Sequence, residues 1–105
     1  MTVPINFNGL DTGVHGPIRL GILTALALDG PLDFTTLKKR LDLSDGAIAP
    51  HLRKLEEISY LHCRKGFVGR RPKSTYRITA AGQRALRAHL DALRRVIEAV
   101  DESHP

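Results

Sequence analysis

The chain has 105 residues, which is the size of one folded domain, and apolar residues make up 42% of it. It has no Trp and only 5% aromatic residues, so aliphatic side chains must build the core. The net charge of +5 favours a polyanionic partner, most often nucleic acid. A single cysteine, Cys63, excludes an internal disulfide and favours a cytoplasmic location. No apolar run is long enough to cross a bilayer, and the first residues do not have the pattern of a secretory signal.

The first half of the chain begins with an irregular segment and continues with a helix. Residues 1–14 contain glycine and proline among polar residues, which predicts an extended or loosely turned arm. Pro17 favours a helix start, because proline is well accommodated in a first helical turn. Gly30 and Pro31 then end this helix. Apolar residues recur along one face of it at helical spacing: Ile18, Ile22, Ala25 and Leu26.

Two further helices, joined by a short turn, are expected next. Asp33 is a good N-cap for a helix that reaches about Leu41. Ser44 is a good N-cap for a third helix over residues 44–58. The third helix has a buried stripe formed by Ile48, Leu52, Leu55 and Ile58. A pair of short helices joined in this way is typical of a helix–turn–helix.

The segment from Arg64 to Arg77 carries the strongest functional signal in the sequence. It contains six basic residues and no acidic one: Arg64, Lys65, Arg70, Arg71, Lys73 and Arg77. Apolar and polar residues alternate at its two ends, in 61–64 and 76–78, which predicts two strands. Because the connection between them is long and rich in glycine, we expect a flexible wing instead of a tight turn.

The last predicted element is a long helix from about Ala80 to Asp101, with Thr79 as its cap. Its apolar residues repeat at alternating steps of four and three: Leu86, Leu90, Leu93, Ile97 and Val100. A small domain needs only part of such a helix for its own core, so we expect this seam to form the interface of a homodimer. The alternative is a helix that folds back on its own domain.

Three segments of the chain resemble the small winged helix–turn–helix regulators of the ArsR/MarR-like group. They are the opening helix (15–23), the end of the third helix (52–61), and the wing with the following helix start (69–82). Their order and spacing together make the resemblance specific, and it covers about residues 10–95. It implies an α+β, mainly helical fold with a two-stranded basic wing and a long C-terminal dimerisation helix. It also implies a dimeric transcriptional regulator.

We therefore interpret the chain as one domain with three parts. Residues 1–14 form an N-terminal arm, residues 15–79 form the DNA-binding core, and residues 80–105 form the dimerisation helix. One residue departs from the pattern of the group, because Pro50 lies inside the third helix where a polar residue is usual. Proline removes the hydrogen bond to the Gly46 carbonyl and crowds it. Either the helix kinks there, or residues 44–48 form a separate turn.

The winged-helix arrangement defines the residues expected to contact double-stranded DNA. The third helix would place its outward N-terminal side chains in the major groove, and the wing would lie on the minor groove and the backbone. From the helix we expect contacts by Ser44, Gly46, Ala47, Pro50, His51, Arg53 and Lys54. From the wing we expect contacts by Arg64, Lys65, Arg70, Arg71, Lys73 and Arg77. Asp45 opposes this picture, because a carboxylate repels phosphates.

The sequence gives little support for metal binding, cofactor binding or catalysis. The five histidines are scattered and only one cysteine is present, so no metal site and no cofactor is expected. No phosphate-binding loop and no catalytic triad can be assembled, so we do not expect an enzyme. The favoured function is a homodimeric, sequence-specific DNA-binding regulator, with repression as its expected effect. The alternative is a winged-helix module that binds an acidic protein. Whether a small-molecule effector binds is left open, because no set of residues indicates one.

Overall fold

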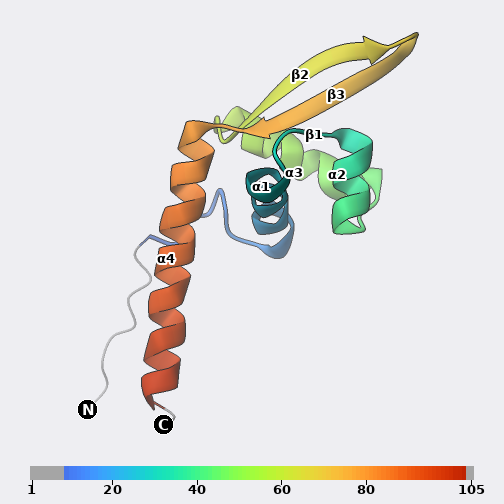
Figure 1. Ribbon diagram of the computed structural model, residues 1–105. Coiled ribbons are helices and arrows are strands. Elements are labelled where there is room, and N and C mark those ends of the chain that lie inside the picture. Colours follow the sequence, from blue (N-terminus) through green and yellow to red (C-terminus); the bar gives the residue numbers. More distant parts are fainter. Residues whose placement is uncertain (1–8, 104–105) are drawn as a thin grey trace.

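The computed structural model describes residues 9–103, which form helices and a small antiparallel sheet (Figure 1). In chain order the elements are α1 (Pro17–Asp29), β1 (Leu32–Asp33), α2 (Phe34–Leu41), α3 (Asp45–Glu57), β2 (Leu61–Val68), β3 (Arg71–Ile78) and α4 (Ala80–Ser103). The predicted α+β, mainly helical winged helix–turn–helix fold is confirmed. Most of the expected N-terminal arm, residues 1–8, lies outside the described residues.

The helices begin and end at the residues that local sequence signals predict. Pro17 is the first residue of α1, and Gly30, with φ of 78°, follows its last residue. The side chain of Asp33 accepts a hydrogen bond of 2.7 Å from the backbone N–H of Thr36 and so caps α2. Ser44 caps α3 in the same way. These caps satisfy backbone donors that would otherwise have no partner in the first helical turn.

Pro50 lies inside α3, and the helix continues through it from Asp45 to Glu57. The alternative of a separate turn over residues 44–48 is therefore wrong. The Gly46 carbonyl still lacks its usual donor, because proline has no N–H. The helix is held instead by its buried face, since Ile48, Leu52 and Leu55 are each at most 1% exposed.

The sheet has three antiparallel strands in the order β1–β3–β2. The short strand β1 was not predicted. It pairs Leu32 with Tyr76 and Asp33 with Thr75, so the segment between α1 and α2 is attached to the base of the wing. Beyond this base the wing has only two strands, and Figure 1 shows that it projects away from the helices.

The prediction of a long, flexible connection inside the wing is wrong. Strands β2 and β3 pair continuously from Leu61 with Ile78 to Val68 with Arg71, which leaves only Gly69 and Arg70 in the turn. Gly69 has φ of 62°, and a positive φ at the first of two turn residues is favourable for glycine. Apart from Arg70 in the turn, the cations of the wing are therefore carried on paired strands, which hold them in a fixed register.

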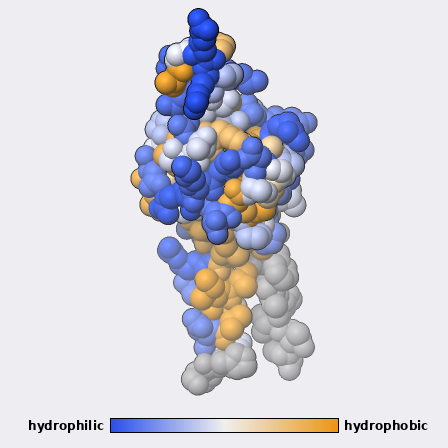
Figure 2. Space-filling model, turned by 90° about the vertical axis from the view of Figure 1, so that its right-hand side faces the viewer, coloured by the Kyte–Doolittle hydropathy of each residue, from blue (hydrophilic) through white to orange (hydrophobic). Residues whose placement is uncertain are grey.

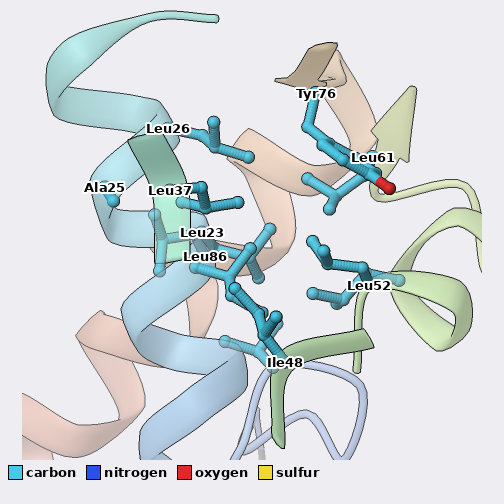
Figure 3. Close-up of a cluster of buried hydrophobic side chains, with 12 residues drawn as sticks. Leu23, Ala25, Leu26, Leu37, Ile48, Leu52, Leu61, Tyr76 and Leu86 are labelled. Carbon is cyan, nitrogen blue, oxygen red and sulfur yellow. The ribbon is translucent and has the colours of Figure 1, made fainter. Parts of the chain in front are cut away.

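All four helices and the sheet contribute to one hydrophobic core, part of which is shown in Figure 3. Its members include Leu23, Leu26, Leu37, Ile48, Leu52, Leu55, Leu61, Tyr76 and Leu86. Aliphatic side chains dominate this core, as the composition predicts. Leu86, which we expected in a dimer seam, is 6% exposed and packs inside its own domain.

Helix α4 starts against the turn between α3 and β2 and then extends well past the other helices (Figure 1). The Thr79 hydroxyl accepts a hydrogen bond of 3.0 Å from the N–H of Gly82, so Thr79 caps this helix as predicted. Gly82 is needed for the close approach, because a Cβ there would overlap the carbonyl oxygen of Tyr60. Within residues 9–103, no helix is both long enough and apolar enough to cross a membrane.

The segment before α1 packs on the domain, at least over the residues that the structure describes. Val14 is fully buried, and the N–H of Asp11 donates a hydrogen bond of 3.1 Å to Nδ1 of His89 in α4. The two carboxylate oxygens of Asp11 accept from the N–H of Gly13 and the hydroxyl of Tyr60. Residues 11–14 therefore connect α4 with the end of α3.

Candidate nucleic-acid interface

The N-terminal half of α3 presents a mostly exposed surface of small and polar residues. Ser44, Gly46, Pro50, Arg53 and Lys54 are exposed, while Ala47 and His51 are half-buried. The buried stripe of α3 faces the opposite way and joins the core. The helix–turn–helix thus leaves most of the α3 positions predicted for DNA contact exposed.

At the start of α3, the backbone is accessible to a partner. The Ser44 hydroxyl accepts a hydrogen bond of 3.2 Å from the N–H of Ala47, so its own proton stays available for donation. A Cβ at Gly46 would meet no atom within 4 Å, which shows that packing in the domain does not require glycine there. The missing side chain instead permits a large partner to approach the helix closely.

His51 is held in place by a residue that the sequence analysis did not single out. Nε of Arg19, in α1, donates a hydrogen bond of 3.1 Å to Nδ1 of His51. Because a guanidinium can only donate, Nδ1 must be the acceptor, and the neutral ring then carries its proton on Nε2. His51 therefore offers one defined donor from a half-buried position.

Asp45 has a basic partner within the domain. Its carboxylate forms an ion pair with Lys38 at the end of α2, across the turn of the helix–turn–helix. This pair was not predicted, because it depends on how the two helices are placed. The positive charge of Lys38 partly offsets the repulsion between the Asp45 carboxylate and a phosphate.

In the wing, the strand register separates the cations by face. On the outer face Arg64 lies opposite Thr75, and Arg77 lies opposite His62. By the same alternation, Lys73 and Arg71 share this outer face. Lys65 is an even number of residues from Leu61 and Cys63, so it lies with them on the other face. Arg70 is in the turn. The charges thus surround the wing instead of covering one side of it.

Only one of these cations has a carboxylate partner among the described residues. Lys73 lies 3.7 Å from Oδ2 of Asp33, the residue that caps α2. The hydrogen bonds from Thr36 lower the pKa of Asp33, and the charge of Lys73 lowers it further. Within residues 9–103, no carboxylate lies within ion-pair distance of the remaining cations, which are Arg64, Lys65, Arg70, Arg71 and Arg77.

The wing begins beside α3, because β2 packs against that helix. Figure 1 shows the wing extending past α2 and α3, away from α4. Figure 2 views the molecule from this side, and hydrophilic residues cover much of the wing and of the helical body below it. A single elongated polyanion can therefore contact both regions at once.

The described residues do not form a metal-binding cluster, and Cys63 and Tyr76 pack with the core. Among residues 9–103, no group of three or more His, Cys, Asp or Glu side chains is arranged to hold a metal ion. Cys63 is half-buried at the edge of the core, where it packs as a small apolar residue. Burial of Tyr76 raises the pKa of its phenol, which keeps this buried side chain neutral beside Cys63.

Comparison with known proteins decides the family. A family model described as a winged helix DNA-binding domain matches residues 18–97, which is most of the chain. The chain belongs to this winged helix DNA-binding family. The match spans every helix and strand from α1 to most of α4, so it includes both halves of the candidate interface.

Relatives of this winged-helix protein agree with that assignment. An uncharacterised protein of Methanocaldococcus jannaschii is 33% identical over 73 residues, which cover 70% of this chain and 79% of that protein. The structure of a transcriptional regulator homologue from Pyrococcus horikoshii is 30% identical, with a TM-score of 0.77 over 85% of this chain and 88% of that one.

A third comparison concerns the fold of this winged-helix protein alone. A protein from Enterococcus faecalis assigned to the MarR family of transcriptional regulators is 22% identical, with a TM-score of 0.69 over 88% of this chain and 82% of that one. The predicted resemblance to small winged-helix regulators is confirmed, and the protein is a DNA-binding regulator of this kind.

Proposed function

We propose that this protein binds specific sequences in double-stranded DNA as a homodimer and represses transcription in the cytoplasm. One observation supports this most directly. The wing, whose cations are largely without carboxylate partners in the described chain, begins beside α3 and extends past it, away from α4. Such an arrangement of a recognition helix and a basic wing is suited to contact one duplex in two places.

In this proposal α3 enters the major groove with its N-terminal half. Arg53 can donate two hydrogen bonds to guanine, and the Ser44 hydroxyl and His51 Nε2–H can donate to base acceptors. The remaining expected contacts are with the backbone or through close approach, by Gly46, Ala47, Pro50 and Lys54. Backbone contacts fix the position of the helix, whereas the base contacts would provide sequence preference.

The wing would contact the minor groove and its flanking phosphates. Arg70 lies in the turn and is suited to the negative potential of a narrow minor groove. The cations on the two strands would contact the backbone; these are Arg64, Lys65, Arg71, Lys73 and Arg77. Lys73 can exchange its contact with Asp33 for a phosphate, because an exposed ion pair of this kind contributes little free energy.

Dimerisation would use the part of α4 that extends beyond the domain. Leu90, Ile97 and Val100 are 41%, 58% and 55% exposed. Figure 2 shows a hydrophobic strip along this projecting part of the helix. Leu93 lies in the same heptad register and is half-buried. Pairing of two such strips would cover apolar surface that a monomer leaves in water.

Selection of bound duplexes from a random pool, followed by titrations at several salt concentrations, tests the proposal. With about four phosphate contacts per subunit, a dimer makes about eight, and the slope of log K against log salt should be near −7. A palindromic motif is expected from a two-fold symmetric dimer. A slope shallower than about −2, or recovery of no motif, would contradict sequence-specific binding through the wing and α3.

A further inference from the structure

Two large apolar side chains lie exposed within the most basic part of the protein. Phe67 is 74% exposed and Val68 is 60% exposed, next to the turn of the wing. Their surroundings are cationic, because Arg70 and Arg71 follow within a few residues. Single exposed apolar residues are common on protein surfaces. An aromatic ring at the end of an arm that the domain itself does not cover is less readily explained by packing.

The strand register gives Phe67 a specific neighbour. Phe67 lies directly opposite Pro72, whereas Val68 lies opposite Arg71 on the other face. Side chains directly opposite each other in antiparallel strands are close enough to pack together. Phe67 and Pro72 therefore form an apolar pair on one face near the end of the wing.

This face continues the one that packs on the helices at the base of the wing. Phe67 has the same parity along β2 as Leu61 and Cys63, which pack on the core at the base of the wing. At the base the face is covered by the domain, and toward the turn it is free. Near the turn the apolar pair is therefore open to a duplex that reaches from α3 to the wing.

We propose that Phe67, supported by Pro72, inserts between two base pairs from the minor groove and bends the DNA. This inference rests on the proposed function and names the role of one apolar pair within it. Phenylalanine and proline are both residue types that minor-groove-binding proteins use as wedges between base steps. The cations on either side supply the attraction that holds the backbone while the step is partly unstacked.

The construction of the wing is suited to this role. A wedge must transmit force to the DNA, and the two-residue turn at Gly69 with continuous pairing makes the arm a short paired ribbon. Val68 and Arg71 lie on the opposite face, so the ribbon presents the apolar pair and the outer cations in different directions. One face inserts while the other remains available for phosphates.

A wedge would add sequence preference at a position that no polar side chain reads. Partial unstacking requires least free energy at pyrimidine–purine steps such as TA and CA/TG. We therefore expect a flexible step beneath each wing in the selected duplexes. Two wings in a dimer would place two such steps symmetrically about the centre of the site.

The test compares full-length wild-type protein, Phe67→Ala and the matched control Val68→Ala on one selected duplex. Bending is measured by fluorescence energy transfer between the duplex ends, and unstacking by 2-aminopurine placed at the wing-contacted step. Phe67→Ala should reduce the bend, abolish the 2-aminopurine increase and weaken binding about tenfold, with the salt slope unchanged. Val68→Ala should bend the DNA as the wild type does.

The outcomes separate this inference from the proposed function. If the wild-type protein binds the duplex and Phe67→Ala binds and bends it equally well, the proposed insertion of Phe67 is wrong. The proposal that the protein binds DNA is then unaffected. If the wild-type protein binds no duplex, both are wrong. Thermal unfolding followed by circular dichroism serves as the folding check. Because Phe67 is largely exposed, its replacement should leave the melting temperature unchanged, so a loss of bending can be attributed to the interface.

Discussion

The hydroxyl of Tyr60 donates a hydrogen bond of 2.5 Å to the carboxylate of Asp11, a residue 49 positions earlier in the chain. The same carboxylate accepts from the N–H of Gly13, and the N–H of Asp11 donates to His89. Three parts of the domain thus meet at one acidic residue. The hydrogen bond to Asp11 raises the pKa of Tyr60, because it stabilises the protonated phenol beside a negative charge.

Removing the Tyr60 hydroxyl should destabilise the fold without changing its shape. Tyr60→Phe keeps the ring and deletes one hydrogen bond to a charged acceptor, so the free energy of unfolding should fall by about 1.5 to 3 kcal/mol. Urea denaturation measures this as a lower midpoint with an unchanged slope. Thr12→Ala, an exposed neighbour of Asp11, is the control and should have almost no effect. Equal midpoints for Tyr60→Phe and wild type would contradict this role of Asp11.

Stability should fall in mildly acid solution because of His89. Its side chain is fully buried, and burial together with the nearby His15 ring, 5.4 Å away, lowers its pKa below the ordinary 6.5, although Asp11 raises it slightly. Below pH 6.5 the unfolded chain therefore binds a proton that the folded chain does not. The free energy of unfolding should be independent of this group above that pH and decrease from there toward the folded-state pKa.

The measurement for His89 is urea denaturation between pH 5 and pH 8. His89→Gln should have a flatter stability profile in the acid part of this range than the wild type, whatever its stability at neutral pH. His62→Gln replaces an exposed histidine and should keep the wild-type profile. A His89→Gln profile as steep as that of the wild type would assign the acid sensitivity to other groups.

How far the fold follows from the sequence depends on how local each signal is. Pro17, Asp33 and Ser44 act within one helical turn, so the starts of α1, α2 and α3 could be predicted from short windows. Strand β1 could not be predicted in this way. Its two residues form a strand only because they pair with Tyr76 and Thr75, which lie far along the chain. Tertiary pairing created this element.

The strands of the wing were predicted too short, and their connection too long, for a related reason. Strand prediction uses alternation between a buried and an exposed face, and residues 64–73 are exposed on both faces. No hydrophobic period marks the strands there, although their backbones pair without a break. The same limit applies to the interface. The exposed positions of α3 followed from its buried stripe, whereas the pairs Arg19 with His51 and Lys38 with Asp45 depend on how helices are placed.

Arg71→Ala should change the salt dependence of DNA binding. If Arg71 contacts one phosphate in each subunit, its removal should make the slope of log K against log salt shallower by about 2 for a dimer. Affinity should fall for all duplexes alike, because a phosphate contact carries no sequence information. Arg94→Ala, which removes the same charge from the projecting part of α4, should leave the slope unchanged. Equal slopes for Arg71→Ala and wild type would place Arg71 away from the backbone.

Arg19→Leu should blur sequence preference although Arg19 itself is not expected to touch a base. Without the donor from Arg19, the His51 ring is free to rotate and to place its proton on either nitrogen. We expect discrimination at one base pair of each half-site to fall about tenfold. A double-mutant cycle with His51→Ala measures the coupling. If Arg19 acts through His51, the two losses should not add; additive losses would show that Arg19 acts by itself.

A single charge on the projecting part of α4 should separate the proposed dimer into folded monomers. Ile97 is 58% exposed and lies in the hydrophobic strip, so Ile97→Asp would place a carboxylate in the interface without disturbing the domain core. Light scattering at micromolar concentration should give the dimer mass for wild type and the monomer mass for Ile97→Asp. The control Ala99→Asp adds the same charge within one turn but off the seam, and should stay dimeric. Ile97→Asp should also lower the affinity for a palindromic site, because monomers bind each half-site separately. A monomer mass for the wild-type protein at this concentration would contradict the proposed interface directly.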